Sequence, residues 1–223
     1  MKRWHYIVLA GLGLLGIVYV YLHRQELGLV GSSDSGTSSS RSSDLPTVSS
    51  RPPRITWATV NRPKDGFKVE MPTDVKEIQI PAYNESGGTD QVNMIFANPS
   101  ADTTFSLAWA DNPPVVRMNG RAPDRTLDMA RDEALARTQT TLITEARSTP
   151  LGFPARDIVA HNVGGGVMDT RLILTSERLY MLTAVFPSTA ARREQDVIRF
   201  FNSFATSGSR SIPERMPGAP APD

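Results

Sequence analysis

Hydrophobic and polar positions divide the chain into four parts. Residues 1–30 contain a long uncharged apolar run, whereas residues 31–54 are rich in Ser and almost free of apolar side chains. Residues 55–206 alternate apolar and polar positions with the periods of strands and helices, and residues 207–223 are rich in Pro, Ser and Gly. Stretches of the Ser- and Pro-rich kind bury too little apolar surface to offset the entropy of ordering. We therefore predict a membrane-spanning segment, a flexible linker, one folded domain and a disordered tail, in that order.

The apolar run from Trp4 to Leu22 predicts a single transmembrane helix. It contains no Asp, Glu, Lys or Arg, and as a helix it would be about 28 Å long, close to the hydrocarbon core of a bilayer at about 30 Å. Aromatic rings at both ends suit the headgroup region, and small residues in the middle allow neighbouring helices to approach closely. These positions are Trp4, Tyr6, Gly11, Gly13, Gly16, Tyr19 and Tyr21.

Basic residues before this run predict its orientation. Lys2 and Arg3 precede it, which by the positive-inside rule keeps the N-terminus in the cytoplasm. The predicted location is the bacterial inner (cytoplasmic) membrane, with the C-terminal domain in the periplasm. A cleaved secretory signal peptide is the alternative, but the run is longer than the roughly 7–15 apolar residues of such a peptide. Both interpretations export the domain, and the linker is either a passive spacer or a segment that becomes ordered along a partner.

The domain pattern predicts short strands, such as the one in which Phe67, Val69 and Met71 alternate with polar residues. The predicted strands are residues 55–60, 67–72, 75–80, 92–96, 105–109, 140–146, 155–161, 167–175 and 179–186. The last is apolar on both faces, which is typical of a central strand. Hairpin turns are expected at residues 83–90 and at the glycine-rich segment 162–166.

Two helices follow from apolar positions three and four residues apart. One opens near Pro123, with Asp124 or Thr126 as the N-cap, and the other opens at Thr189. The expected core-facing residues are Leu127, Ala130, Ala134 and Leu135 in the first helix, and Val197, Ile198, Phe201 and Phe204 in the second. The order strands, helix, strands, helix with short connections predicts an α+β domain, in which helices pack against a mainly antiparallel sheet.

Composition narrows the chemistry that this domain can perform. The chain of 223 residues has no Cys, which excludes disulfides, thiolate metal sites and a Cys nucleophile. Its net charge is +1, and acidic and basic residues are nearly balanced in the domain, so we expect no nucleic-acid partner. No set of residues resembles a nucleophile with its base and orienting group, so the predicted protein is not an enzyme.

Histidines are the first candidates for cofactor binding. His5 and His23 lie at the two ends of the apolar run, and a neutral imidazole in a membrane span can ligate the magnesium of a pigment. We favour the simpler interpretation of polar residues at the membrane interface. His161 is expected on the surface of a hairpin. The predicted cofactors are therefore none, with at most peripheral contact with pigments or lipids.

Two further patterns are weak candidates. Asp124, Asp128 and Asp132 recur every four residues on one helix face, but helical carboxylates rarely converge on Ca²⁺ or Mg²⁺, so we favour a solvated face. The glycines at 164–166 lack the frame of a phosphate-binding loop. We predict no metal site and no catalytic residue.

A Pro-rich irregular segment follows the strand that ends near Trp109. Loops that rest on a rigid sheet often carry binding contacts. We therefore predict a partner surface here, formed by Trp109, Pro113, Pro114, Val116 and Met118.

Four short motifs within residues 60–205 resemble the PsbP-like family. Gly66-Phe67-Lys68-Val69-Glu70-Met71-Pro72 resembles the opening of its domain, and Leu151-Gly152-Phe153-Pro154-Ala155 resembles its central turn. Residues 178–182 and 199–204 are similar to its penultimate strand and closing helix. The resemblance implies an antiparallel sheet flanked by helices. Photosynthetic members are extrinsic subunits of a photosystem, so it also implies a non-enzymatic accessory role; the anchor and linker depart from the family pattern.

Together these features predict a membrane-anchored accessory or structural subunit of a larger membrane complex. The assembly that we favour is a bacterial photosynthetic reaction centre or light-harvesting complex. The expected partners are the lipid bilayer and the integral subunits of that complex. The alternative is an exported, membrane-tethered module that binds a ligand or peptide between sheet and helix.

Overall fold

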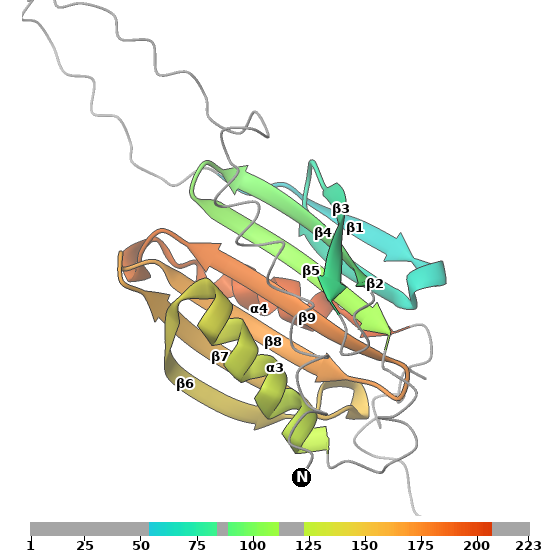
Figure 1. The fold of residues 1–223 in the computed structure, drawn as a ribbon. Helices are drawn as coiled ribbons and strands as arrows, with labels where there is room; N and C mark the ends of the chain where they lie inside the picture. The colour runs from blue at the N-terminus through green and yellow to red at the C-terminus, as the bar shows by residue number, and fades with distance from the viewer. Residues whose placement is uncertain (1–53, 84–88, 112–122, 207–223) are drawn as a thin grey trace, which may run out of the picture.

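The computed structural model describes residues 54–83, 89–111 and 123–206, and its main feature is a seven-stranded antiparallel sheet (Figure 1). The strand order is β3-β4-β5-β9-β8-β7-β6. The strands are β3 (Lys76–Tyr83), β4 (Thr89–Ser100), β5 (Thr103–Asp111), β6 (Thr140–Ser148), β7 (Ala155–Asn162), β8 (Val167–Leu174) and β9 (Arg178–Phe186). The predicted α+β fold with a mainly antiparallel sheet is confirmed, and the apolar β9 lies at its centre as expected.

A second, three-stranded sheet was not predicted. It consists of β1 (Trp57–Arg62), β2 (Phe67–Pro72) and the two-residue β10 (Ala205–Thr206), in the order β1-β2-β10. Strand β2 lies near the start of the described domain and β10 lies at its end, so their pairing brings the two ends of the domain together. Three short 3₁₀ helices complete the described elements: η1 (Pro63–Asp65), η2 (Pro150–Gly152) and η3 (Thr189–Ala191).

Two helices cover opposite faces of the large sheet, as Figure 1 shows. Helix α3 (Pro123–Thr138) packs across β6, β7 and β8, and helix α4 (Glu194–Ser203) packs on the other face, against β2. Neither helix, within the three described ranges, has the length and apolarity needed to cross a bilayer.

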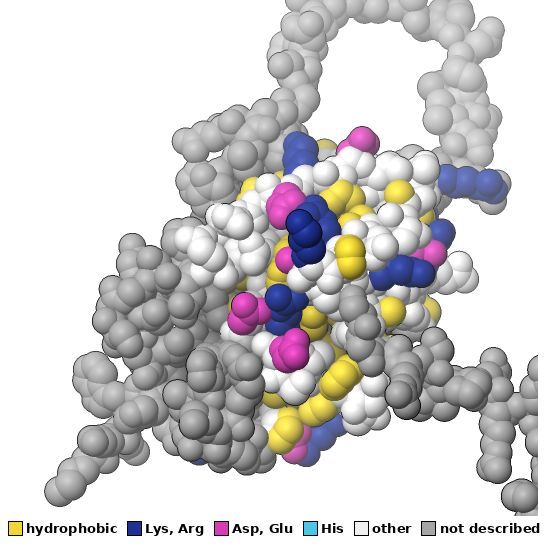
Figure 2. All heavy atoms as spheres, turned by 90° about the vertical axis from the view of Figure 1, so that its right-hand side faces the viewer, with side chains coloured by type: hydrophobic (Ala, Val, Ile, Leu, Met, Phe, Trp, Pro, Cys, Tyr) yellow, Lys and Arg dark blue, Asp and Glu magenta, His cyan; other side chains and the backbone are white. Residues whose placement is uncertain are grey.

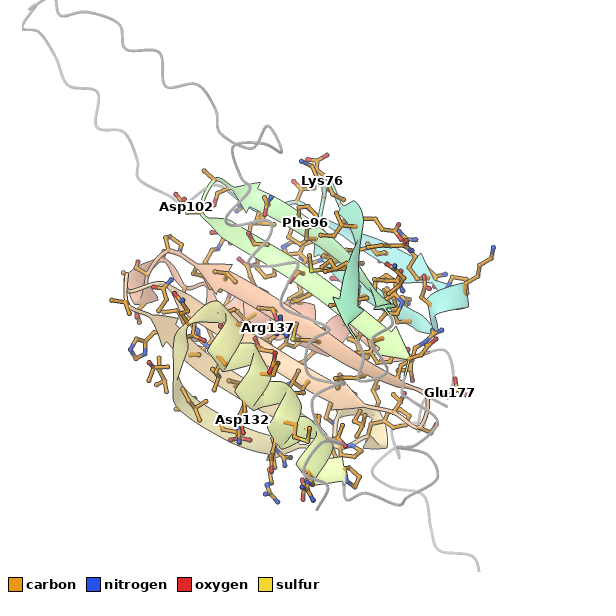
Figure 3. All side chains as sticks on the ribbon, in the orientation of Figure 1. Lys76, Phe96, Asp102, Asp132, Arg137 and Glu177 are labelled. Carbon is orange, nitrogen blue, oxygen red and sulfur yellow. The ribbon has the colours of Figure 1, made fainter. Side chains whose placement is uncertain are left out.

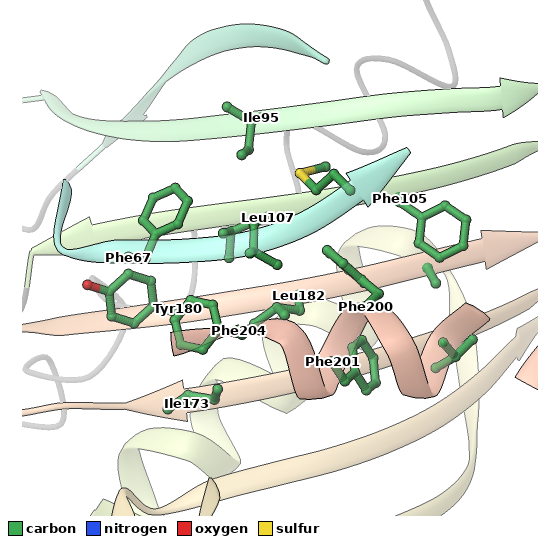
Figure 4. Packing of buried hydrophobic residues seen from close by; sticks show 14 of the residues in the cluster. Phe67, Ile95, Phe105, Leu107, Ile173, Tyr180, Leu182, Phe200, Phe201 and Phe204 are labelled. Atoms are coloured by element: carbon green, nitrogen blue, oxygen red, sulfur yellow. The ribbon is translucent and has the colours of Figure 1, made fainter. Parts of the chain in front are cut away.

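Strand alternation creates one hydrophobic cluster on each face of the large sheet. The cluster on the α3 side includes Met94, Phe96, Leu127, Leu172 and Met181. The cluster on the α4 side is aromatic and joins the two sheets (Figure 4); it includes Phe67, Phe105, Trp109, Phe186, Phe200 and Phe204. Contacts between these rings are mostly edge-to-face, such as Phe105 with Phe186 and with Phe200.

Several local predictions about the helices were wrong. Helix α3 already begins at Pro123, so Asp124 and the buried Thr126 lie inside it and neither is its N-cap. The segment at Thr189 forms the 3₁₀ turn η3, and α4 begins only at Glu194. Ile198, which was predicted to face the core, is half exposed. Phe200, which was not in the prediction, is fully buried in its place.

The predicted span and tail, and the predicted linker except for Arg54, lie outside the described residues. This applies to Trp4, His5, Tyr6, Gly11, Gly13, Gly16, Tyr19, Tyr21 and His23. The predicted hairpin at residues 83–90 is supported by its flanks, because Tyr83 of β3 pairs with Thr89 of β4. Its tip, residues 84–88, is likewise outside the described residues.

Candidate functional site at the ends of the 112–122 loop

The predicted partner surface falls at the loop between β5 and α3. Trp109 lies in β5, is 3% exposed, and packs edge-to-face on Phe67 with ring centroids 4.9 Å apart. Its indole is therefore part of the core and offers no exposed contact. The other four predicted residues, Pro113, Pro114, Val116 and Met118, lie outside the described residues. What the structure does describe is how the chain is held on both sides of the loop.

On the N-terminal side, an ion pair holds the last residue of β5. Asp111 pairs across the sheet with Arg178, the first residue of β9. The Arg178 Nε donates a hydrogen bond to Asp111 Oδ1 at 2.7 Å. Glu177, labelled in Figure 3, marks the turn between β8 and β9 at this end of the sheet. The loop therefore departs from a fixed point at the end of the central strands.

Tyr180 of β9 extends this anchor to the small sheet. Its hydroxyl donates a hydrogen bond to the carbonyl oxygen of Asp65 in η1, at 3.1 Å. Burial raises the pKa of the Tyr180 hydroxyl above its ordinary value, so the group keeps its proton and remains a donor. The contact links η1 to the sheet end from which the loop departs.

Gly66 makes this close approach feasible. Its backbone φ is +75°, a left-handed conformation, and a Cβ there would lie 3.1 Å from Tyr180 Oη and 3.3 Å from Arg178 Nη1. A side chain at this position would therefore be strained twice, by the backbone and by the two polar groups.

Gly66→Ala is expected to destabilise the domain by about 2–3 kcal/mol, of which about 1–2 kcal/mol is the cost of a left-handed non-Gly residue and about 1 kcal/mol the disturbed Tyr180 hydrogen bond. Gly152→Ala is the matched control, since Gly152 has φ +80° but nothing within 4 Å of its Cβ position. Urea unfolding of both variants measures the difference. Equal losses would show that the approach of Tyr180 contributes nothing.

On the C-terminal side, a buried arginine holds the first turns of α3. The side chain of Arg156 in β7 is 2% exposed, and its Nη2 contacts Asp124 Oδ1 at 2.6 Å and Asp128 Oδ1 at 3.1 Å. Its Nε lies 3.0 Å from Glu145 Oε1 of β6. Three carboxylates from a helix and an edge strand thus converge on one guanidinium, which fixes the point where the loop ends.

Two more arginines complete this charged cluster at its rim. Arg131 contacts Glu145 at 2.5 Å and Asp132 at 2.7 Å, and the exposed Arg147 contacts Asp124 at 3.2 Å. Asp132 lies on the outer side of α3, as Figure 3 shows.

The side chains of Asp124, Asp128 and Asp132 are 49%, 38% and 67% exposed, which agrees with the predicted solvated helix face. What was not predicted is that Asp124 and Asp128 also contact the buried Arg156. Sequence reasoning missed Arg156, although a signal was present: strand alternation places it on the same face as the buried Ile158 and Ala160.

The pKa of Asp124 is lowered from its ordinary value of 3.8, chiefly by the hydrogen bond from Arg156 and in part by the charge of Arg147, while burial opposes the shift. A carboxylate with a lowered folded-state pKa stabilises the fold fully above pH 3.8, and this contribution is lost as pH falls through the folded-state pKa.

Asp124→Asn is accordingly expected to destabilise the domain at neutral pH, with a difference from the wild type that disappears in strong acid. Unfolding measured from pH 7 down to well below pH 3.8 tests this, because the difference should shrink progressively as the pH falls below that value. In an Arg156→Met background the same substitution should lose this pH dependence, because Arg156 is its main cause. A pH-independent difference would contradict the assignment.

Two other ion pairs brace the opposite face. The buried Asp169 accepts three hydrogen bonds from Arg192, of which the shortest is 2.8 Å. Arg171 donates to Asp157 at 2.5 Å and lies over the Phe201 ring. Figure 2 shows acidic and basic side chains interspersed rather than gathered by sign on the face that it presents. His161 is exposed, as predicted. Among the described residues, no three His, Asp or Glu side chains are placed to hold a metal ion.

Of the comparisons with known proteins, the comparison with solved structures is the one that found matches. No protein-family model and no curated protein matches the chain. The chain is similar to cyanobacterial PsbP (CyanoP) from Synechocystis sp. PCC 6803, at 12% identity and a TM-score of 0.49, over 74% of this chain and 98% of that one. It is also similar to a protein of unknown function from Pseudomonas aeruginosa, at 13% identity and a TM-score of 0.34, over 64% of this chain and 90% of that one. Neither similarity assigns a function to this chain.

Proposed function

We propose that this chain is a non-enzymatic accessory subunit of a larger membrane complex, anchored by its N-terminal apolar run. The run from Trp4 to Leu22 carries no Asp, Glu, Lys or Arg and is long enough to span a bilayer. The Ser-rich linker behind it, as a flexible coil, would have a reach of about 25–30 Å. Such a tether allows the folded domain to contact neighbouring subunits at the membrane surface.

The observation that carries the proposal is the pair of anchors at the 112–122 loop. Asp111 is held by Arg178 at one end, and Asp124 and Asp128 are held by the buried Arg156 at the other. The described residues on both sides of 112–122 are thus held in place, one by the sheet and one through helix α3, and a segment presented from a rigid scaffold is a common location for binding contacts.

The assembly that we favour for this subunit is a bacterial photosynthetic reaction centre or light-harvesting complex. Support comes from the PsbP-like motifs at Gly66–Pro72 and residues 151–155. Within such a complex the domain would lie on the periplasmic side, and the span would pack on neighbouring helices through Gly11, Gly13 and Gly16.

Replacing residues 112–122 with a Gly/Ser segment of equal length is expected to reduce recovery of partner subunits at least tenfold, because it keeps both anchors and removes only the loop side chains. Mild detergent extraction of membranes, affinity capture and mass spectrometry measure the recovery. The control is the same replacement at residues 84–88, the hairpin between β3 and β4, which should leave recovery unchanged. Equal recovery from both variants would contradict the role of the loop.

The same extract separates the proposed function from its alternative. Co-migration of the chain with a pigment–protein complex in size-exclusion chromatography is expected for an accessory subunit. A ligand-binding module would migrate as a free species, and that result would contradict the proposal.

A further inference from the structure

Strand β6 is an exposed edge of the seven-stranded sheet. It follows β7 at the end of the strand order, and most of its side chains are exposed. An edge strand presents unpaired backbone N–H and C=O groups to any strand that approaches it. The opposite edge, β3, is blunted: Pro81 has no N–H to donate, and Glu77 forms an ion pair with Arg62 at 2.6 Å. Among the described strands, β6 is therefore the edge of the large sheet that is open to pairing.

Exposed hydrophobic side chains lie at both ends of β6. Leu142 and Ile143 at its start are 38% and 51% exposed, and Leu151 just beyond its end is 43% exposed. The register shifts between Leu142 and Thr144, so Ile143 has no partner on β7 and the regular edge is Thr144–Ser148. The short polar segment Thr144–Ser148 lies between these two groups of hydrophobic side chains.

The polar segment carries one acid and one base two residues apart. Glu145 and Arg147 therefore lie on the same face of the sheet, the α3 face, where Glu145 contacts Arg156 and Arg147 contacts Asp124. Arg147 is 69% exposed and can turn to a second partner without leaving a buried charge unpaired.

We propose that β6 pairs antiparallel with β6 of a second copy of this chain, about a two-fold axis at Ala146. In this register Glu145 of each copy lies opposite Arg147 of the other, so the contact contains two opposite-charge cross-strand pairs. The antiparallel direction also brings Leu142 and Ile143 of one copy to the end that carries Leu151 in the other.

Other two-fold registers are less favourable. An axis at Glu145 would place the two Glu145 carboxylates opposite each other, and like charges directly opposite are destabilising. An axis at Thr144 would place Glu145 opposite Ile143 and would leave both charges without a partner. The inference is independent of the proposed accessory role, since it uses neither the 112–122 loop nor the apolar run.

Single-cysteine cross-linking tests the register in the full-length chain, because the chain has no Cys of its own. Ala146→Cys places two thiols across the axis, where antiparallel Cα atoms are about 4.5–5.5 Å apart and within disulfide range. Thr144→Cys is the matched control, exposed and on the same strand face; its two copies would be about 13 Å apart along the strand, beyond that range. Mild oxidation of cells that express each full-length variant is expected to give at least tenfold more covalent dimer from Ala146→Cys than from Thr144→Cys.

A charge reversal adds a second measurement. Arg147→Glu in the Ala146→Cys background would place acids opposite each other and should reduce the covalent dimer at least fivefold, whereas Lys76→Glu on the opposite edge should leave it unchanged. Equal cross-linking of Ala146→Cys and Thr144→Cys, or more from Thr144→Cys, would overturn the proposal. So would a disulfide product between Ala146→Cys and a different protein in place of the homodimer.

Discussion

Replacing Arg156 with Met is expected to lower the free energy of unfolding by about 1–3 kcal/mol, the cost of leaving hydrogen-bonding partners unsatisfied, because the three carboxylates that lose it are 21–49% exposed and stay hydrated. The guanidinium is surrounded by Asp124, Asp128 and Glu145, and its side chain is almost fully buried. Without Arg156, the carboxylates of Asp124, Asp128 and Glu145 lose their shared partner. Arg131 and Arg147, at the edge of the cluster, remain to balance their charge. The loss should be largest where α3 begins, because both aspartates lie in its first two turns.

Urea unfolding of the full-length chain in mild detergent, followed by tryptophan fluorescence, measures this loss. Arg147→Met is the matched control, since Arg147 belongs to the same cluster but is mostly exposed and contacts Asp124 alone at 3.2 Å. Exposed ion pairs contribute about 0–1 kcal/mol. Similar losses in the two variants would show that burial of Arg156 is unimportant. Hydrogen exchange should also show faster opening of the first turns of α3 in Arg156→Met than in Arg147→Met.

Strand periodicity made most of the fold predictable. Phe67, Val69 and Met71 alternate with polar residues in the sequence, and all three are fully buried in β2. The segment at 179–186, which is apolar on both faces, forms the central strand β9, because a strand covered on both faces needs no polar side. Local pattern is sufficient wherever burial on one face of one element decides the structure.

The errors have two physical sources. Val197, Phe200, Phe201 and Phe204 are spaced three and four residues apart, the period of one helix face, so Ile198 falls about 100° away from their centre at 3.6 residues per turn. This spacing was present in the sequence, and it predicts Phe200 rather than Ile198 on the core-facing side. The small sheet was not predictable in this way, since β10 has two residues and joins β2 from 137 positions away, Ala205 opposite Lys68.

The charged cluster lies beyond local pattern for the same reason. Asp124 and Arg156 are 32 positions apart in the chain and meet only because α3 packs on β7. Their residue types indicated charge but not pairing, so a solvated face was the natural interpretation of Asp124 and Asp128. Trp109 is the opposite case, because local pattern did predict its burial: it continues the alternation of Phe105 and Leu107. It was nevertheless assigned to the partner surface because it precedes a Pro-rich segment.

Phe67→Ala is expected to cost about 3–5 kcal/mol, the usual range for a large aromatic side chain removed from a core. Phe67 is fully buried and joins the small sheet to the large one (Figure 4). Its ring centroid lies 4.9 Å from that of Trp109 in β5, 6.1 Å from that of Tyr180 in β9 and 6.3 Å from that of Phe204. No neighbouring side chain can fill the space without leaving one of these contacts.

Ile198→Ala on α4 is the control, because Ile198 is half exposed and its truncation should cost less than about 1 kcal/mol, in the range of surface substitutions. Urea unfolding followed by circular dichroism gives both values. The loss in Phe67→Ala should be accompanied by faster hydrogen exchange in β1 and β2, since this ring contacts Trp109 of β5 and Tyr180 of β9 from the small sheet. A large loss with unchanged exchange in β1 and β2 would mean that the two sheets are held together by other contacts, with α4 and its Phe200 as the first to examine.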